Sequence, residues 1–82
     1  MKAQRSGSVD VSGMTPLRSN CIKAVKFNEH NGNLLIRFPT AIYLYFTLKK
    51  VTITRLMKSQ SPGRYFQRNI SGKYRFEKVT AL

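Results

Sequence analysis

The segment from Ile42 to Phe46 constrains the fold most, because every residue in it is apolar or aromatic. In an extended strand Ile42, Leu44 and Phe46 point to one face of the sheet. Tyr43 and Tyr45 then point to the other face. A strand that is apolar on both faces has to lie centrally in a sheet or be covered twice. The rest of the chain must therefore supply neighbouring strands and a cover.

Two segments before it have the pattern of β-strands. Apolar residues are spaced along 22–27, and the Asn-Gly pair at Asn31 and Gly32 then tolerates the positive φ of a tight hairpin. Between Leu34 and Phe38 apolar side chains alternate, so that one face of a second strand is buried. Residues 39–41 interrupt this strand before the segment at 42–46. We predict a three-stranded antiparallel meander.

The apolar period changes after Val51. Ile53, Leu56 and Met57 have the i, i+3, i+4 spacing of a helix that is buried on one side, and Thr52 is its expected N-cap. The first helix is therefore predicted to begin just after the third strand.

A second, shorter helix is predicted from Ser61 onwards. Ser61 reads as its cap and Pro62 as its first residue, where the missing N–H costs nothing. Phe66 and Ile70 are four residues apart and face the core. Gly72 is expected to end this segment in the left-handed conformation. The alternation that follows, over residues 73–77, indicates a final strand or an extended tail along the sheet.

These elements predict one small α+β domain over residues 19–82, in which the meander precedes the two short helices. Residues 1–18 are rich in Gly, Ser, Thr and Pro without a regular apolar period, and we expect a flexible N-terminal arm there. The single Cys21 excludes an internal disulfide and suits a reducing cytoplasm. The longest apolar run is far shorter than the ~20 residues of a membrane span, which predicts a soluble protein without a membrane partner.

In this order the elements resemble the KTSC domain, a family named from the C-terminus of some lysyl-tRNA synthetases and also found as small bacterial and phage proteins. The likeness runs from about Ser19 to Tyr74. It departs from the family at the turns, where this chain has Phe27-Asn28, Pro39-Thr40-Ala41 and Val51-Thr52. The family has no established activity, and its attachment to a synthetase only suggests RNA binding. The residues that carry the likeness are Ser19, Ile22, Val25, Phe27, Leu34, Ile36, Phe38, Tyr43-Leu44-Tyr45, Ser61-Pro62-Gly63-Arg64-Tyr65-Phe66, Ile70 and Tyr74.

Charge indicates the kind of partner. The chain has 15 Lys and Arg against 3 Asp and Glu, a formal net charge of +12. Nine of these cations lie between Lys49 and Leu82, where Glu77 is the one carboxylate. Solubility of a small domain needs a net charge of only about 2 to 8 in magnitude. The excess predicts a polyanionic partner, bound with an affinity that falls steeply as salt rises.

Our first hypothesis is a non-enzymatic module that binds RNA or single-stranded DNA, with Arg and Lys on phosphates and tyrosines stacked on bases. Under the alternative, Tyr43 and Tyr45 are core residues and binding depends on charge. A second hypothesis is a protein-interaction module that docks on an acidic surface of a host protein. A third is that the basic excess serves solubility alone. The candidate nucleic-acid-binding residues are Arg55, Lys58, Arg64, Arg68, Lys73, Arg75, Tyr43, Tyr45 and Tyr65.

No combination of residues predicts catalysis. Cys21 and His30 lack a third, orienting group and an oxyanion site, and they read as a packing thiol and a turn residue. Three scattered carboxylates do not provide a paired acid and base or a metal site, and the five glycines are dispersed rather than gathered in a phosphate loop. We therefore expect no enzymatic activity, no cofactor and no metal.

Overall fold

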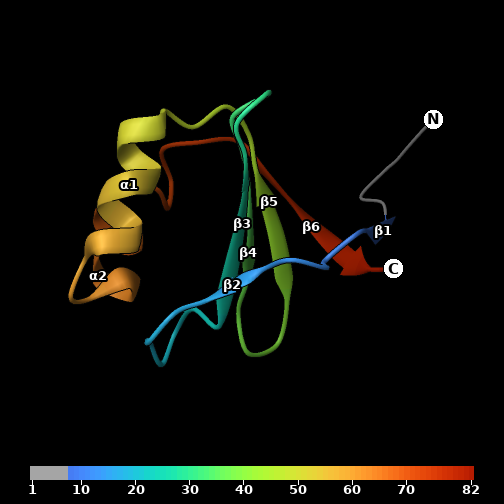
Figure 1. Cartoon of the computed structure of the whole chain (residues 1–82), viewed down its shortest axis with the longest axis horizontal. Coiled ribbons are helices and arrows are strands. Elements are labelled where there is room, and N and C mark those ends of the chain that lie inside the picture. Colours follow the sequence, from blue (N-terminus) through green and yellow to red (C-terminus); the bar gives the residue numbers. More distant parts are fainter. Residues whose placement is uncertain (1–7) are drawn as a thin grey trace.

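The computed structural model describes residues 8–82 of the chain (Figure 1). Within these residues, six strands and two helices make up an α+β fold, with both helices packed on one side of the sheet (Figure 1). In chain order the elements are β1 (Ser8–Val9), β2 (Thr15–Pro16), β3 (Ala24–Asn28), β4 (Asn33–Arg37), β5 (Ile42–Tyr45), α1 (Lys50–Lys58), α2 (Pro62–Asn69) and β6 (Phe76–Ala81).

The strands form one mixed sheet in the order β1-β6-β5-β4-β3-β2. Strands β3, β4 and β5 are the antiparallel meander that the sequence predicts. A three-stranded sheet nevertheless understates the fold, because β6 adds to β5, β1 pairs in parallel with β6, and β2 pairs with β3. The end of the chain is thus a strand rather than a tail. Two-residue strands such as β1 and β2 are too short for any apolar period to reveal them.

The turn between β3 and β4 has the predicted hairpin geometry. Gly32 has a φ of +76° and donates its N–H to the carbonyl of Asn28 at 2.8 Å. The Asn28 side chain accepts the N–H of His30 at 2.9 Å, and the Asn31 side chain accepts that of Asn33 at the same distance. Side chains and a left-handed glycine together satisfy the backbone of the turn.

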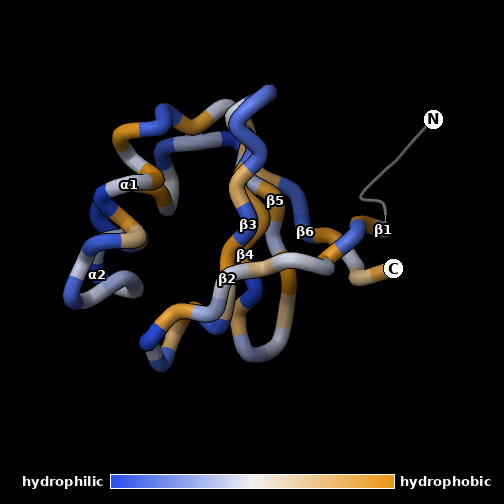
Figure 2. Tube along the Cα trace, viewed as in Figure 1, coloured by the Kyte–Doolittle hydropathy of each residue, from blue (hydrophilic) through white to orange (hydrophobic). Residues whose placement is uncertain are grey.

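The larger core cluster lies between the sheet and the helices. Alternate residues of β4 enter it, and Tyr45 enters it from β5. The hydropathy pattern follows this arrangement, since apolar positions recur along the strands and along α1 (Figure 2). The cluster consists of Ile22, Val25, Leu34, Ile36, Tyr45, Leu48, Ile53, Leu56, Phe66 and Ile70.

The opposite face of the sheet carries a smaller cluster of Leu35, Ile42 and Val79. Val9, Val11, Met14 and Leu44 pack against it. The chain between β1 and β2 therefore crosses this face, from one edge of the sheet to the other. Strand β5 is central and covered on both faces, as its sequence predicts. Of the predicted arm at 1–18, residues 1–7 lie outside the described part, and residues 8–18 include β1 and β2.

Helix α1 begins earlier than predicted. Lys49 occupies the N-cap position, and its carbonyl accepts the N–H of Thr52 at 3.0 Å. Thr52 as N-cap is therefore wrong, because backbone bonds to Lys49 already close the first turn. Ile53 and Leu56 are buried as predicted, whereas Met57 is 37% exposed. The buried stripe of this helix is narrower than the i, i+3, i+4 pattern implies.

Helix α2 begins where the sequence predicts. Ser61 is at the N-cap and Pro62 is the first helical residue, although the Ser61 side chain makes no capping hydrogen bond. Phe66 and Ile70 are buried. The helix ends at Asn69 with Ile70 at its C-cap, so Gly72 does not end it as predicted. Gly72, in the turn that follows, has a φ of +78°, the left-handed conformation expected of it.

Candidate functional site

The helical layer, residues 49–73, concentrates positive charge. It contains seven Lys and Arg and no Asp or Glu. All seven side chains are exposed. The seven are Lys49, Lys50, Arg55, Lys58, Arg64, Arg68 and Lys73.

The three side-chain carboxylates lie elsewhere. Glu77 pairs in register with Leu44, which places it on the sheet face away from the helices. Asp10 lies on that same face, in a hollow beside Leu44. Glu29 forms an ion pair with Lys50 at 3.0 Å, the only salt bridge among residues 8–82. Six of the seven cations of the helical layer therefore have no carboxylate partner within the described residues.

The far face carries a smaller excess of positive charge. By register Lys26 and Arg37 lie there, together with Asp10 and Glu77. Arg75, over the ring of Phe46, lies on this face as well. The backbone N–H and the hydroxyl of Ser12 donate to the Asp10 carboxylate at 2.9 and 2.7 Å. These hydrogen bonds lower the pKa of Asp10 below its usual value. The two faces of the sheet thus differ in charge.

Arg64 and Arg68 lie on the same side of α2, as their spacing of four predicts. They line a shallow groove of about 200 Å³ with Ser59, Ser61 and Asn69. Tyr65 also lines this groove and packs partly against the core. Two like charges at this spacing disfavour an isolated helix by a few tenths of a kcal/mol. An anion bound between them would relieve that repulsion.

The other predicted cations do not line this groove. Arg55 and Lys58 are exposed in the last turn of α1, and Lys73 is exposed beyond α2. The guanidinium of Arg75 lies 4.9 Å from the centre of the Phe46 ring, at cation–π distance. Arg75 is thereby directed toward Phe46, and it does not line the groove of Arg64 and Arg68.

The three candidate tyrosines have different environments. Tyr45 is 4% exposed and belongs to the core, so its ring is not available to stack on a base. For Tyr45 the alternative interpretation, that it is a core residue, is confirmed. Burial raises the pKa of the Tyr45 hydroxyl above its usual value, and Tyr43 raises it further. Tyr43 and Tyr65 are half-buried. The stacking role predicted for Tyr45 is thus removed, and those of Tyr43 and Tyr65 stay predictions.

An aromatic groove that the sequence reasoning missed lies beside these tyrosines. It has a volume of about 370 Å³ and is lined by rings from the β4–β5 loop, β5, α2 and β6. Phe76 is the exposed ring, at 48%. The sequence marks Phe76 only as part of an alternating segment, and its proximity to Tyr43 depends on the pairing of β5 with β6. The rings of the aromatic groove are those of Phe38, Tyr43, Tyr45, Phe66 and Phe76.

Residues typical of catalysis do not come together. His30 lies in the β3–β4 turn, and Cys21 is an exposed free thiol before β3. Within residues 8–82 no group of three or more His, Cys, Asp or Glu side chains is placed to hold a metal ion. In the same part of the chain, none of the helices has the length and apolarity to cross a membrane.

Comparison with known proteins identifies the fold. The KTSC domain family matches residues 18–74, and the chain belongs to this family. Among solved structures, the chain is similar to the crystal structure of a KTSC domain protein from Yersinia pestis. The two share 27% sequence identity with a TM-score of 0.78, over 80% of this chain and 94% of that one. No curated protein matches the chain.

Two of the residues that carry the family likeness, Ser19 and Gly63, hold the start of α2 against the segment before β3. Ser19 accepts the N–H groups of Cys21 and Ile22 through its hydroxyl, at 3.2 Å each. A Cβ added at Gly63 would lie 3.1 Å from the Cβ of Cys21 and 3.4 Å from the Ser19 hydroxyl. The start of α2 therefore lies tightly against the segment before β3. Since the family match ends at Tyr74, strand β6 lies beyond it.

Proposed function

We propose that this protein is a non-enzymatic module that binds RNA or single-stranded DNA through its helical layer. The observation that carries the proposal is the unbalanced charge of that layer, seven exposed cations without a carboxylate of its own. Phosphates release condensed counterions when cations of this kind approach them, and that release supplies most non-specific affinity. The cytoplasm is the proposed location, because it suits the exposed free thiol of Cys21.

Within the layer, Arg64 and Arg68 are the proposed principal phosphate contacts. They line one groove and are four residues apart on α2. The phosphate path is extended to either side by Arg55, Lys58 and Lys73. Arg75 adds a further cation outside the helical layer, next to Phe46. A planar guanidinium donates two parallel hydrogen bonds to a phosphate, which favours the arginines as the stronger contacts.

The test is the salt dependence of binding to a labelled uridine homopolymer, followed by fluorescence anisotropy. Replacement of both Arg64 and Arg68 by Ala is expected to weaken binding. It should also reduce the slope of log affinity against log salt by about 1.4, roughly 0.7 for each single-strand phosphate that is no longer neutralised. The folded state should be unaffected, because both side chains are exposed.

A matched control removes two cations from the other face of the sheet, Lys26→Ala with Arg37→Ala. Both double variants lower the net charge equally, so a purely global effect of charge predicts the same loss of affinity for both. Equal losses would refute the assignment of the site to α2. If neither RNA nor DNA binds to the unmodified protein at low salt, the proposal itself fails. Capture of an acidic protein would then favour the protein-interaction hypothesis.

A further inference from the structure

The aromatic groove lies between α2 and the β5–β6 pair, at the edge of the helical layer. The β4–β5 loop and the turn around Gly72 also line the groove. Two of its rings, Tyr45 and Phe66, belong to the core cluster, and the other rings pack on them and on one another. Phe38 meets Tyr43 edge-on, with centroids 5.6 Å apart, and meets Phe66 edge-on at 5.3 Å. The groove therefore has a firm aromatic lining.

Phe76 supplies the accessible ring of this lining. It is stacked with Tyr43 at 5.4 Å and an interplanar angle of 7°, and with Tyr45 at 5.2 Å and 26°. Despite these two contacts it is 48% exposed. The tyrosines fix the orientation of the ring, while half of its surface stays open to a ligand. A planar, oriented and half-open ring is suited to stacking on another planar group.

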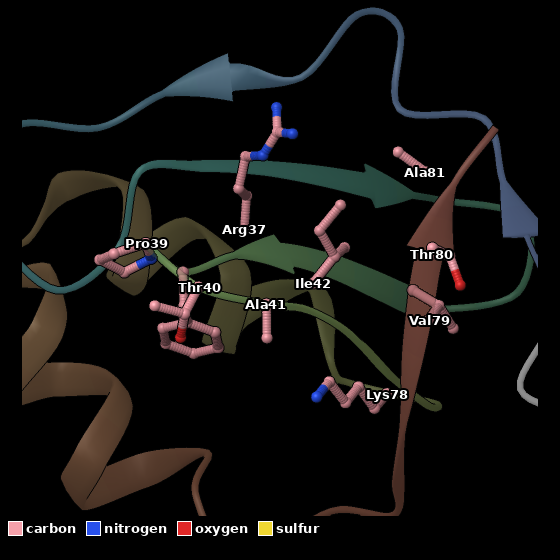
Figure 3. A pocket seen from close by; sticks show the side chains of 10 residues that line it. Arg37, Pro39, Thr40, Ala41, Ile42, Lys78, Val79, Thr80 and Ala81 are labelled. Atoms are coloured by element: carbon pink, nitrogen blue, oxygen red, sulfur yellow. The ribbon is translucent and has the colours of Figure 1, made fainter.

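A cation lies beside this ring. Lys78 pairs in register with Tyr43 on β5, so it lies on the same sheet face as Phe76, two residues away. Figure 3 shows the Lys78 side chain extending from β6 below Ala41, and the Arg37 side chain pointing away from both. The trough of about 520 Å³ in that view shares Phe38, Thr40 and Ala41 with the aromatic groove, so the two hollows adjoin.

The charges around the groove favour one occupant. Lys78 has no carboxylate partner among residues 8–82, and Glu77 next to it in sequence lies on the other face. Lys73 follows Gly72, which lines the groove, and it is exposed. An apolar peptide or a second copy of this basic chain would leave these cations unpaired or repelled. A planar group attached to an anion matches both the ring and the cations.

We propose that the aromatic groove binds one unpaired nucleobase of a single-stranded nucleic acid, stacked on Phe76, with Lys78 on an adjacent phosphate. This inference rests on the proposed function and adds a reason for strand selectivity. In a duplex the bases are paired and stacked inside, so they cannot enter the groove. The helical layer alone holds phosphates of either form, and the groove distinguishes single strands.

The first experiment compares Phe76→Leu with Phe76→Tyr, which keeps a ring at the same position. Binding is measured by anisotropy to a uridine homopolymer and to a duplex of equal length. Phe76→Leu is expected to weaken single-strand binding about 5- to 150-fold, the effect of losing one stacked base, and to leave duplex binding unchanged. Phe76→Tyr should retain the single-strand affinity. Equal effects on both nucleic acids, or none on either, would overturn the inference while leaving the proposed function intact.

A second experiment detects the stacking directly. The chain contains no Trp, so Phe76→Trp places a unique fluorophore in the groove. The homopolymer should quench this fluorescence, whereas inorganic polyphosphate, a polyanion without bases, should not. Leu82→Trp, at an exposed position outside the helical layer, is the control and should change less with either polymer. Quenching by polyphosphate to the same extent would show that no base enters the groove. This readout needs only the folded Trp variant, so it decides the question even if Phe76→Leu fails to fold.

Discussion

Gly32→Ala tests how the β3–β4 turn holds the start of the helical layer. Gly32 has a φ of +76°, and its carbonyl accepts the N–H of Leu48 at 2.7 Å. A Cβ added there would lie 3.0 Å from the carbonyl oxygen of Leu48 and 3.3 Å from the Cα of Thr47. Both are backbone atoms, so the close approach cannot be relieved by the rotation of a side chain. The segment that leads into α1 would have to move.

The size of the effect follows from two terms. A left-handed conformation costs an L-residue roughly 1–2 kcal/mol, partly offset by about 0.4–1 kcal/mol because Ala restricts the unfolded chain. Overpacking against fixed atoms adds roughly 1–3 kcal/mol. We therefore expect Gly32→Ala to lower the free energy of unfolding by about 2–4 kcal/mol. For a domain of this size that corresponds to a fall in Tm of roughly 10–25 °C.

Gly13→Ala is the matched control. Gly13 has almost the same φ, +77°, but an added Cβ would meet nothing within 4 Å. In this variant only the left-handed conformation is unfavourable, without overpacking, so its free energy of unfolding should fall by only about 1 kcal/mol. Urea unfolding followed by circular dichroism measures both free energies. Equal losses in the two variants would refute the argument, because they would show that the close approach to Leu48 costs nothing.

Two further predictions concern the core. Leu56→Ala should lower the free energy of unfolding, measured by urea titration, by about 2–5 kcal/mol, because Leu56 is fully buried. Met57→Ala, next to it and exposed, should lower it by less than about 1 kcal/mol. Similar losses in the two variants would contradict the placement of α1. The raised pKa of Tyr45 means that the folded state disfavours its ionised form. The resulting contribution to stability should be present below pH 10 and lost as the pH rises through the folded pKa. Alkaline unfolding monitored by tyrosinate absorbance should therefore show a smaller loss of stability in Tyr45→Phe than in the unmodified protein, and parallel curves would count against burial as the cause.

Local residue patterns were enough to predict the elements of the meander and both helices. Alternation identifies β4 and β5, and an Asn-Gly pair marks the turn before β4, because each of these signals acts over a few neighbouring residues. The start of α2 follows in the same way from Ser61 and Pro62. The start of α1 did not, since Thr52 looks like a cap in sequence but the backbone of Lys49 takes that place.

The sequence by itself also determined the amount of positive charge and its concentration between Lys49 and Lys73, since composition along a chain needs no coordinates. Tertiary structure alone decided which faces this charge and the aromatic rings occupy. Register placed Glu77 away from the helices and Phe76 beside Tyr43, and packing under the helices buried Tyr45. These placements depend on strands that are distant in the chain and become neighbours only when the sheet forms, so no local pattern encodes them.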